Sequence, residues 1–340
     1  MELRGSDILT MDQFDREDLR RIFDTAAEME VYASRQKMTR VLEGAVLANL
    51  FFSSSTRSRI SFGSAFNRLG GAVRDTTSID ESSIAKGESL EATARVVSGY
   101  SDAIVLRYPE EDAAKMVADA SPLPVINGGD GSNEHPTQGL LDIFTILKER
   151  KMSLDDLDGL VVAVGGDLKY GRAAHSIVKG LSIFRNICYK LIATDELQMP
   201  DKIVELLRNR GHQVLQTSDL SEGIKDVDIV YMTRNQEDRM PRELATHLRG
   251  KIFLDRRTYE RYARPDTTIM HPLPIDIRPG AQEIKPDLYD HPNFAVYRQT
   301  DNGMPVRMSI YVHLLGVVDR VHDTVRDAFW FRPDRTDSHR

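Results

Sequence analysis

The chain has 340 residues, of which 41% are hydrophobic and 29% are charged, which is enough apolar material for two folded domains. Its formal net charge of −7 argues against a surface that binds nucleic acid or an anionic membrane. The single cysteine, Cys188, excludes an intrachain disulfide and a zinc site built from cysteines. No apolar run reaches membrane-spanning length and the N-terminus lacks a signal-peptide core, so we expect a cytoplasmic protein.

Short apolar stretches alternate with amphipathic ones along the chain, a pattern typical of parallel sheets flanked by helices. We therefore expect an α/β fold with two domains, each a parallel sheet flanked by helices. The predicted strands are residues 45–52, 103–106, 123–126, 160–164, 187–192, 229–232, 252–254 and 268–270. The predicted helices are residues 60–69, 91–100, 138–148, 172–181, 202–210 and 308–321. A polar stretch at 152–159 interrupts the alternation and indicates a nearby domain junction.

A run of small hydroxyls and arginines, SSSTRSR at 53–59, joins the first predicted strand to the first predicted helix. Backbone N–H groups at a helix N-terminus lack partners inside the helix and carry partial positive charge. Hydroxyls and a guanidinium added there would suit a phosphate dianion. The alternative is a serine-rich turn that only caps the helix, and this segment alone does not decide between the two.

Further polar groups follow other predicted strands, at the edge where ligands of open α/β sheets bind. Taken singly, an arginine there is usually a solvated surface group, and a histidine before proline usually caps or packs. Their recurrence at one edge instead predicts a pocket for one or two strongly anionic ligands. The set is Arg107, His135, Gln138, Arg172, Arg234 and His271.

Several chemistries are excluded by missing patterns. The chain has no G-x-x-x-x-G-K-[ST] loop and no G-x-S-x-G elbow. Gly165 and Gly166 do not complete a dinucleotide-binding G-x-G-x-x-G. His135, His175 and His271 lack metal-site spacing. We therefore expect no metal and no cofactor, and a site that stabilises a transferring group electrostatically.

Five short motifs together resemble the transcarbamylase family. STRS at 55–58 is similar to the family's S-T-R-T carbamoyl-phosphate signature, and HPTQ at 135–138 and HPLP at 271–274 match two others. DLKYGR at 167–172 and MTRNQ at 232–236 resemble the aspartate carbamoyltransferase catalytic chains of that family. The likeness runs from about residue 8 to about residue 320.

The resemblance implies a reaction and a division of the chain. Carbamoyl phosphate and L-aspartate would give N-carbamoyl-L-aspartate and phosphate, a step of de novo pyrimidine biosynthesis. Residues 1–150 would form the carbamoyl-phosphate-binding domain, completed by C-terminal helices at about 300–340. Residues 151–299 would form the aspartate-binding domain.

The resemblance also implies roles for individual side chains. Phosphate would be held by Ser55, Thr56, Arg57 and Ser58. The carbonyl oxygen would be polarised by Thr56, Arg107 and His135, with Gln138 positioning the amide. The amino group would be oriented by the backbone carbonyls of Leu273 and Pro274. The two carboxylates of aspartate would be bound by Arg172, Arg234 and Gln236.

A polar loop that contains Ser82 and Lys86 matches a family loop that enters the neighbouring subunit's site. Lys86 would thereby contact substrate and take part in catalysis. The resemblance implies a homotrimer with shared active sites, with regulatory chains or a pyrimidine-pathway protein as further partners. No nucleic-acid or membrane partner is expected.

The chain also departs from the family pattern. Asp238 stands where a glutamate is expected, and Ile275 stands where relatives usually carry arginine; the sequence does not decide whether nearby Arg278 substitutes for it. Both positions lie in loops that the family links to domain closure.

Two other functions are alternatives to an aspartate carbamoyltransferase. An ornithine enzyme would usually show His-Cys-Leu-Pro, whereas Pro272 stands here, and Arg234 with Gln236 favours a dicarboxylate. A catalytically silent subunit that scaffolds a pathway complex would lose its active-site groups freely, but Arg57 and Lys86 are intact, as are Arg107 and His135.

Overall fold

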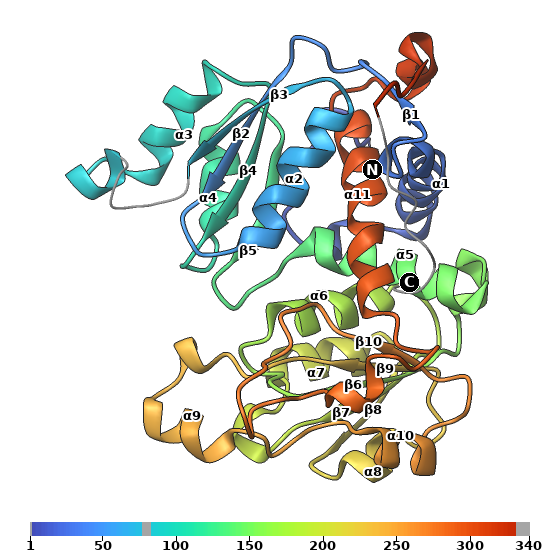
Figure 1. The fold of residues 1–340 in the computed structure, drawn as a ribbon. Coiled ribbons are helices and arrows are strands. Elements are labelled where there is room, and N and C mark those ends of the chain that lie inside the picture. The colour runs from blue at the N-terminus through green and yellow to red at the C-terminus, as the bar shows by residue number, and fades with distance from the viewer. Residues whose placement is uncertain (1, 77–82, 331–340) are drawn as a thin grey trace. The chain divides into compact units, whose positions relative to one another are not determined.

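The structure is a computed structural model that describes residues 2–76 and 83–330. The chain forms two compact units (Figure 1). Unit 1 contains residues 1–140 and 301–340, and unit 2 contains residues 141–300. The divisions fall inside two helices, α5 (Pro136–Arg150) and α11 (Val296–Leu314). The boundary expected from the sequence, after residue 150, lies at the last residue of the same helix α5.

Unit 1 is built on a four-stranded parallel sheet with the order β3-β2-β4-β5. Helices α3 (Leu90–Ser98) and α4 (Ala113–Ala120) cover one face, and α2 (Thr56–Arg68) covers the other (Figure 1). Alternate residues of a strand point to opposite faces, so Ala48 and Leu50 pack under α3 and α4. The strands are β2 (Val46–Phe51), β3 (Ala72–Thr76), β4 (Ala103–Tyr108) and β5 (Val125–Asp130).

Unit 2 is built on a five-stranded parallel sheet with the order β10-β9-β6-β7-β8. One face packs on α8 (Leu220–Gly223) and α10 (Arg256–Tyr262) through a buried apolar cluster, and α6 (Arg172–Leu181) lies over the other face (Figure 1). The strands are β6 (Val161–Gly165), β7 (Cys188–Ile192), β8 (Gln213–Thr217), β9 (Ile229–Met232) and β10 (Thr268–Met270).

The remaining elements complete the two units. The further α-helices are α1 (Arg16–Ala33), α7 (Asp201–Asn209) and α9 (Arg242–Leu248). A two-stranded antiparallel sheet pairs β1 (Lys37–Met38) with β11 (Arg326–Asp327). The 3-10 helices are η1 (Met11–Gln13), η2 (Ser83–Lys86), η3 (Leu154–Leu157), η4 (Asp195–Leu197), η5 (Glu237–Arg239), η6 (Pro286–Leu288) and η7 (Val318–Thr324). Within the described ranges, no helix is both long and apolar enough to cross a membrane.

Each sheet reverses its strand order once, between β2 and β4 in unit 1 and between β6 and β9 in unit 2. The loops that leave such neighbouring strands run to opposite faces of the sheet and open a crevice at the carboxyl ends of the strands. The expected α/β class with two parallel sheets flanked by helices is confirmed. In each sheet, we therefore expect ligands at the loops that follow the two strands beside this reversal. These are the loops after β2 and β4 in unit 1, and after β6 and β9 in unit 2.

Two predicted elements were wrong in detail. Residues 252–254 form no strand, because only Leu254 makes a bridge, to Ile284. The last long helix begins at Val296 instead of residue 308 and runs through Pro305, and residues 318–324 form the separate 3-10 helix η7. A proline lacks an amide hydrogen, which made an earlier helix start look unfavourable from sequence alone.

Candidate functional site

The serine–arginine run lies where β2 of unit 1 ends and α2 begins. Ser55 is the residue before the first helical turn, and its C=O accepts the N–H of Arg59 at 3.2 Å. Its hydroxyl makes no capping hydrogen bond to the helix, so the alternative of a serine that only caps α2 is not what is observed. The Ser53 hydroxyl oxygen is buried and has no hydrogen-bond partner within the described part of the chain. Hydroxyls that the fold does not use are available to an anion at this helix N-terminus.

Arg107 stands beside this run because β2 and β4 are neighbours. Their register sets Phe51 opposite Arg107. The half-buried guanidinium donates to the C=O of Gly128 at 3.1 Å and to the C=O of Ser54 at 3.4 Å. Arg107 therefore joins the serine loop to β5 and brings a second cation to the same corner as Arg57.

His135 is held at this corner by packing against α2. Its buried ring stacks on Phe62 with 6.2 Å between centroids and 19° between planes. Its Nδ1 lies 3.4 Å from the Thr137 hydroxyl, and its C=O accepts the N–H of Gln138 at 2.8 Å at the start of α5. The structure thus places the residues predicted for carbamoyl phosphate in unit 1 at the carboxyl edge of one sheet, namely Ser55, Thr56, Arg57, Ser58, Arg107, His135 and Gln138.

The loop predicted to reach a neighbouring subunit is described only in part. Ser82 lies outside the described residues. Lys86 is the last residue of η2, is exposed, and makes no hydrogen bond or ion pair within the ranges that the structure covers. Because Lys86 is exposed and unpaired within these ranges, its ammonium is available to a partner outside them.

In unit 2, the loop after β6 contacts the loop after β9 closely. Gly166 has a φ of +116°, and a Cβ built there would lie 2.0 Å from the Thr233 carbonyl oxygen, so only glycine fits. The next residue, Asp167, is fully buried and accepts the N–H of Tyr170 and of Gln236, each at 2.9 Å. Burial raises the pKa of Asp167, although these two N–H donors favour its charged form.

Arg234 and Gln236 share the loop after β9 and contact each other. Arg234 Nη2 lies 3.4 Å from the Gln236 side-chain oxygen, and Gln236 Nε2 donates to the C=O of Arg234 at 3.3 Å. Arg172 opens α6 at the end of the facing loop. The structure therefore sets Arg234 and Gln236 side by side and Arg172 on the adjoining loop, which is a donor set suited to carboxylates.

The turn at Leu273 and Pro274 follows β10, the next strand of the same sheet. Leu273 adopts a left-handed φ of 57°, and its peptide bond to Pro274 is cis. The N–H of Leu273 donates to Nδ1 of His271 at 2.8 Å, and Nε2 of His271 lies 2.7 Å from Glu283. His271 and Glu283 are only 1% and 4% exposed. His271, predicted to contact an anionic ligand, instead anchors the backbone of this turn.

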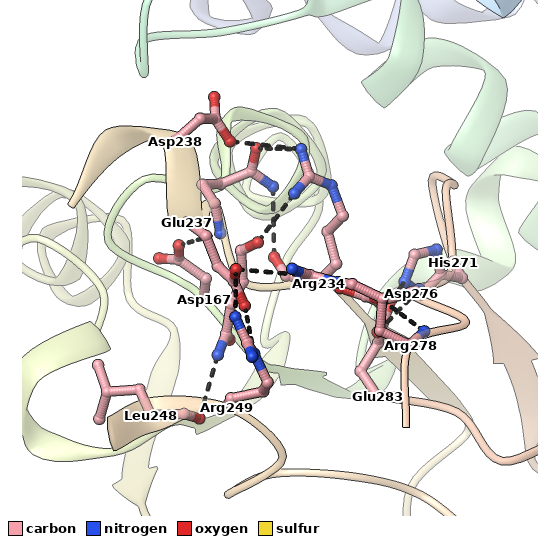
Figure 2. A network of polar contacts seen from close by, with 12 residues as sticks. Asp167, Arg234, Glu237, Asp238, Leu248, Arg249, His271, Asp276, Arg278 and Glu283 are labelled. Atoms are coloured by element: carbon pink, nitrogen blue, oxygen red, sulfur yellow. Dashed lines mark hydrogen bonds and ion pairs between the residues drawn. The ribbon is translucent and has the colours of Figure 1, made fainter. Parts of the chain in front are cut away.

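The two departures from the family pattern have structural consequences. Asp238, one carbon shorter than glutamate, still lies 3.6 Å from Arg234. Ile275 packs on the apolar cluster of unit 2 and carries no charge. Arg278 pairs with Asp276 and, at 3.0 Å, with Glu237 (Figure 2).

Sequence reasoning missed the residues that support the site. Asp167 stood inside a recognised motif but was read only as part of it. Glu237 and Glu283 gave no signal, because each acts on a segment that is distant in sequence, and Arg278 was named only in connection with the arginine absent at position 275. Arg307 of α11 is likewise buried, stacks over Phe62 and donates to the Ser61 hydroxyl at 2.8 Å. Among the described residues, no cluster of three or more acidic, histidine or cysteine side chains could hold a metal.

Two protein-family models match the chain. The family model described as aspartate/ornithine carbamoyltransferase, carbamoyl-P binding domain, matches residues 6–148. The model described as aspartate/ornithine carbamoyltransferase, Asp/Orn binding domain, matches residues 158–314. Because these two matches cover most of the sequence, the chain belongs to the aspartate/ornithine carbamoyltransferase family.

The relatives point to one branch of that family. An aspartate carbamoyltransferase catalytic subunit from Saccharophagus degradans is 52% identical over 332 residues, which are 97% of this chain and 98% of the relative. One from Methanothrix thermoacetophila is 42% identical, over 92% of this chain and 99% of the relative. An aspartate transcarbamoylase from Trypanosoma cruzi, solved with carbamoyl phosphate and aspartate, is 34% identical with a TM-score of 0.84, covering 92% of this chain and 98% of the other.

Proposed function

We propose that this chain is an aspartate carbamoyltransferase. It transfers the carbamoyl group of carbamoyl phosphate to the α-amine of L-aspartate and releases N-carbamoyl-L-aspartate and phosphate. The observation that carries the proposal is the pairing of two kinds of anion-binding edge in one chain. Unit 1 offers a helix N-terminus with hydroxyls and Arg107, and unit 2 offers Arg234 with Gln236.

The mechanism follows from where charge develops. The neutral α-amine of aspartate attacks the carbonyl carbon of carbamoyl phosphate, and negative charge moves first to the carbonyl oxygen and then to the departing phosphate. We assign the carbonyl oxygen to Thr56, Arg107 and His135. Donors that are fixed before the reaction need no reorganisation as charge grows, so they lower the barrier.

The leaving phosphate gains charge as the C–O bond breaks, and it takes up the proton that the attacking amine loses. We assign it to Ser55, Thr56, Arg57 and Ser58 at the start of α2. Charge-assisted hydrogen bonds from Arg57 strengthen as the phosphate forms, so they favour the transition state over the bound substrate. Gln138, half-buried in the first turn of α5, is assigned to the amide of the carbamoyl group.

The nucleophile is oriented by unit 2. We assign the two carboxylates of aspartate to Arg172, Arg234 and Gln236, with Lys86 as a further cation, and the α-amine to the carbonyls of Leu273 and Pro274. Ornithine carries a second ammonium where aspartate carries a carboxylate. Two arginines would repel that ammonium, so the donor set favours the dicarboxylate.

Three wider statements belong to the same proposal. The units defined above serve as the carbamoyl-phosphate and aspartate domains. The enzyme works as a homotrimer in which Ser82 and Lys86 complete the neighbouring site. The relatives are named catalytic subunits, which supports an assembly that can include regulatory chains or a pyrimidine-pathway partner. It acts in de novo pyrimidine biosynthesis, for which we propose a cytoplasmic location.

The test is a product assay with the purified full chain. Carbamoyl phosphate and L-aspartate should yield carbamoyl aspartate and inorganic phosphate in equal amounts, both measured in the same sample. Phosphate release without carbamoyl aspartate would indicate hydrolysis and contradict the proposal. Sedimentation of the same sample should give the mass of three chains, and the mass of one chain would contradict the shared-site arrangement.

A further inference from the structure

A chain of polar contacts in unit 2 joins the two segments that are proposed to hold aspartate (Figure 2). It begins at the buried pair of His271 and Glu283. Because Nδ1 of His271 accepts the N–H of Leu273, the ring carries its proton on Nε2 and donates it to Glu283. Glu283 also accepts the N–H of Asp276 at 3.2 Å. The turn at 271–276 is thus fixed at both ends by buried groups.

The chain continues from Asp276 to Arg278. The Arg278 side chain donates from Nε to both oxygens of Asp276, at 3.0 and 3.1 Å, and its own N–H donates to the same carboxylate at 2.9 Å. Arg278 Nη2 also lies 3.0 Å from Glu237, which receives two more bonds from Arg249 at 3.0 and 2.9 Å. Glu237 directly follows Gln236.

We propose that Arg278 is a positioning residue for aspartate, because it fastens the Arg234–Gln236 segment to the Leu273–Pro274 turn through Glu237 and Asp276. The proposal rests on the function proposed above. Arg278 itself is not among the residues proposed to contact aspartate. Its planar guanidinium can serve two carboxylates at once, which the single ammonium of a lysine does less well.

The charges of the network argue for the same role. Arg249 and Arg278 balance Glu237 and Asp276, so this patch is neutral beside a site for a dicarboxylate. The Arg278 hydrogen bonds lower the pKa of Asp276 most, and Arg234 lowers it further, which means that Asp276 lies within the field of the proposed substrate-binding arginine. Without Arg278, Asp276 would compete with substrate for Arg234, and one uncompensated negative charge would repel aspartate.

The exposure of the Arg278 side chain indicates that its loss would affect positioning more than the stability of the fold. The Arg278 side chain is 51% exposed, whereas Glu237 is 18% and Asp276 is 13% exposed. Exposed ion pairs contribute little to folding. Loss of Arg278 should therefore leave the chain folded while it misplaces the loop that follows β9.

The experiment compares Arg278→Gln, Glu237→Gln and the double variant in steady-state assays with both substrates. We expect Arg278→Gln to raise the KM for aspartate about tenfold and to change the KM for carbamoyl phosphate less than about twofold. The double variant should show less than the product of the two single effects, because both variants break the ion pair between Arg278 and Glu237. Arg278→Lys should recover part of the loss.

The matched control is Arg256→Gln. Arg256 is also an arginine of unit 2 paired with two carboxylates, Glu260 and Asp290, but it contacts neither segment. Its KM for aspartate should equal that of the wild type. An equal rise in both KM values for Arg278→Gln, an unchanged KM for aspartate, or independent effects in the double variant would each overturn the positioning role while the wild type remains active. A wild type that makes no carbamoyl aspartate would overturn the proposed function, and this inference with it.

Discussion

The carboxylate of Asp167 accepts the backbone N–H of Gln236 at 2.9 Å and thereby ties the loop after β6 to the loop after β9. Asp167 is fully buried and also holds the N–H of Tyr170. One carboxylate therefore fixes two loops that carry the proposed aspartate-binding side chains, Arg172 and Arg234. The arrangement spans the place where the sheet of unit 2 reverses its strand order.

Replacing Asp167 by asparagine should loosen both loops. Asparagine has one acceptor oxygen, so one of the two N–H groups would face an NH2 donor and lose its partner, at a cost of about 1–3 kcal/mol. Because burial raises the pKa of Asp167, removal of its charge offsets part of this loss. We expect lower stability in urea unfolding and a higher KM for aspartate. An unchanged KM in the folded variant would show that the bond does not position Gln236.

Arg57→Ala should reduce kcat by at least about a hundredfold while the fold is retained, because a charge-assisted contact that strengthens in the transition state is lost. Arg57 is exposed at the start of α2, so its removal leaves no cavity in the core. Circular dichroism and thermal unfolding would establish the fold, and steady-state kinetics the loss. A folded variant with wild-type kcat/KM would refute the assignment of Arg57 to the phosphate.

Arg234→Ala should raise the KM for aspartate about ten- to a hundredfold, as expected for loss of hydrogen bonds to a charged group. The KM for carbamoyl phosphate should change far less, since Arg234 belongs to unit 2. The comparison of the two KM values in one variant is the measurement. Equal increases would mean that Arg234 acts through stability instead of through substrate contact.

The shared site predicts complementation between two inactive variants. Lys86→Gln and Arg57→Ala chains should each have little activity alone. Mixing at equal ratio after reversible dissociation should restore about a quarter of wild-type sites, because half of the chains supply an intact Arg57 and half of their neighbours an intact Lys86. Isotope-labelled chains would verify exchange. Exchange without recovered activity would place Lys86 in its own chain's site or in none.

At acidic pH, the ion pairs of Arg278 with Glu237 and Asp276 should no longer stabilise the fold. Hydrogen bonds from Arg249, and then Arg278, lower the pKa of Glu237 below its ordinary 4.5, and Arg278 lowers that of Asp276 below 3.8. Lowered carboxyl pKa values stabilise the fold above the ordinary values, and this contribution is lost as pH falls through the lowered ones. Wild type should melt slightly above Arg278→Gln at pH 7, and this difference should shrink as pH falls below the ordinary carboxyl pKa values. A constant difference would contradict this.

Sequence predicted the buried apolar strands well, including the edge strand β10, and the partly solvated edge strands poorly. Strand β9 was placed at its observed bounds, since all four of its residues are buried and apolar. The edge strands β3 and β8 were not recognised, because both are partly solvated and carry polar residues such as Arg74 and Gln216. The start of α2 at Thr56, four residues before the predicted start, brought the phosphate motif into the first helical turn itself.

In the candidate site too, some residues could be named from the sequence and others could not. Motif residues such as Arg57 and Arg234 could be named in advance, because their spacing is local and they follow recognisable strands. The residues that hold them in place could not. Glu283 meets His271 across 12 positions, and Asp167 meets Gln236 across 69, so each contact exists only once the sheet has formed.

The most direct test of the account is the ratio of kcat/KM for L-aspartate to that for L-ornithine, measured on the wild-type chain with saturating carbamoyl phosphate. The donor set of Arg172, Arg234 and Gln236 predicts rapid carbamoylation of aspartate and a ratio of about a thousand or more, because the ornithine ammonium would face two guanidinium groups. A ratio near one, or a preference for ornithine, would contradict the assignment of unit 2 to a dicarboxylate substrate.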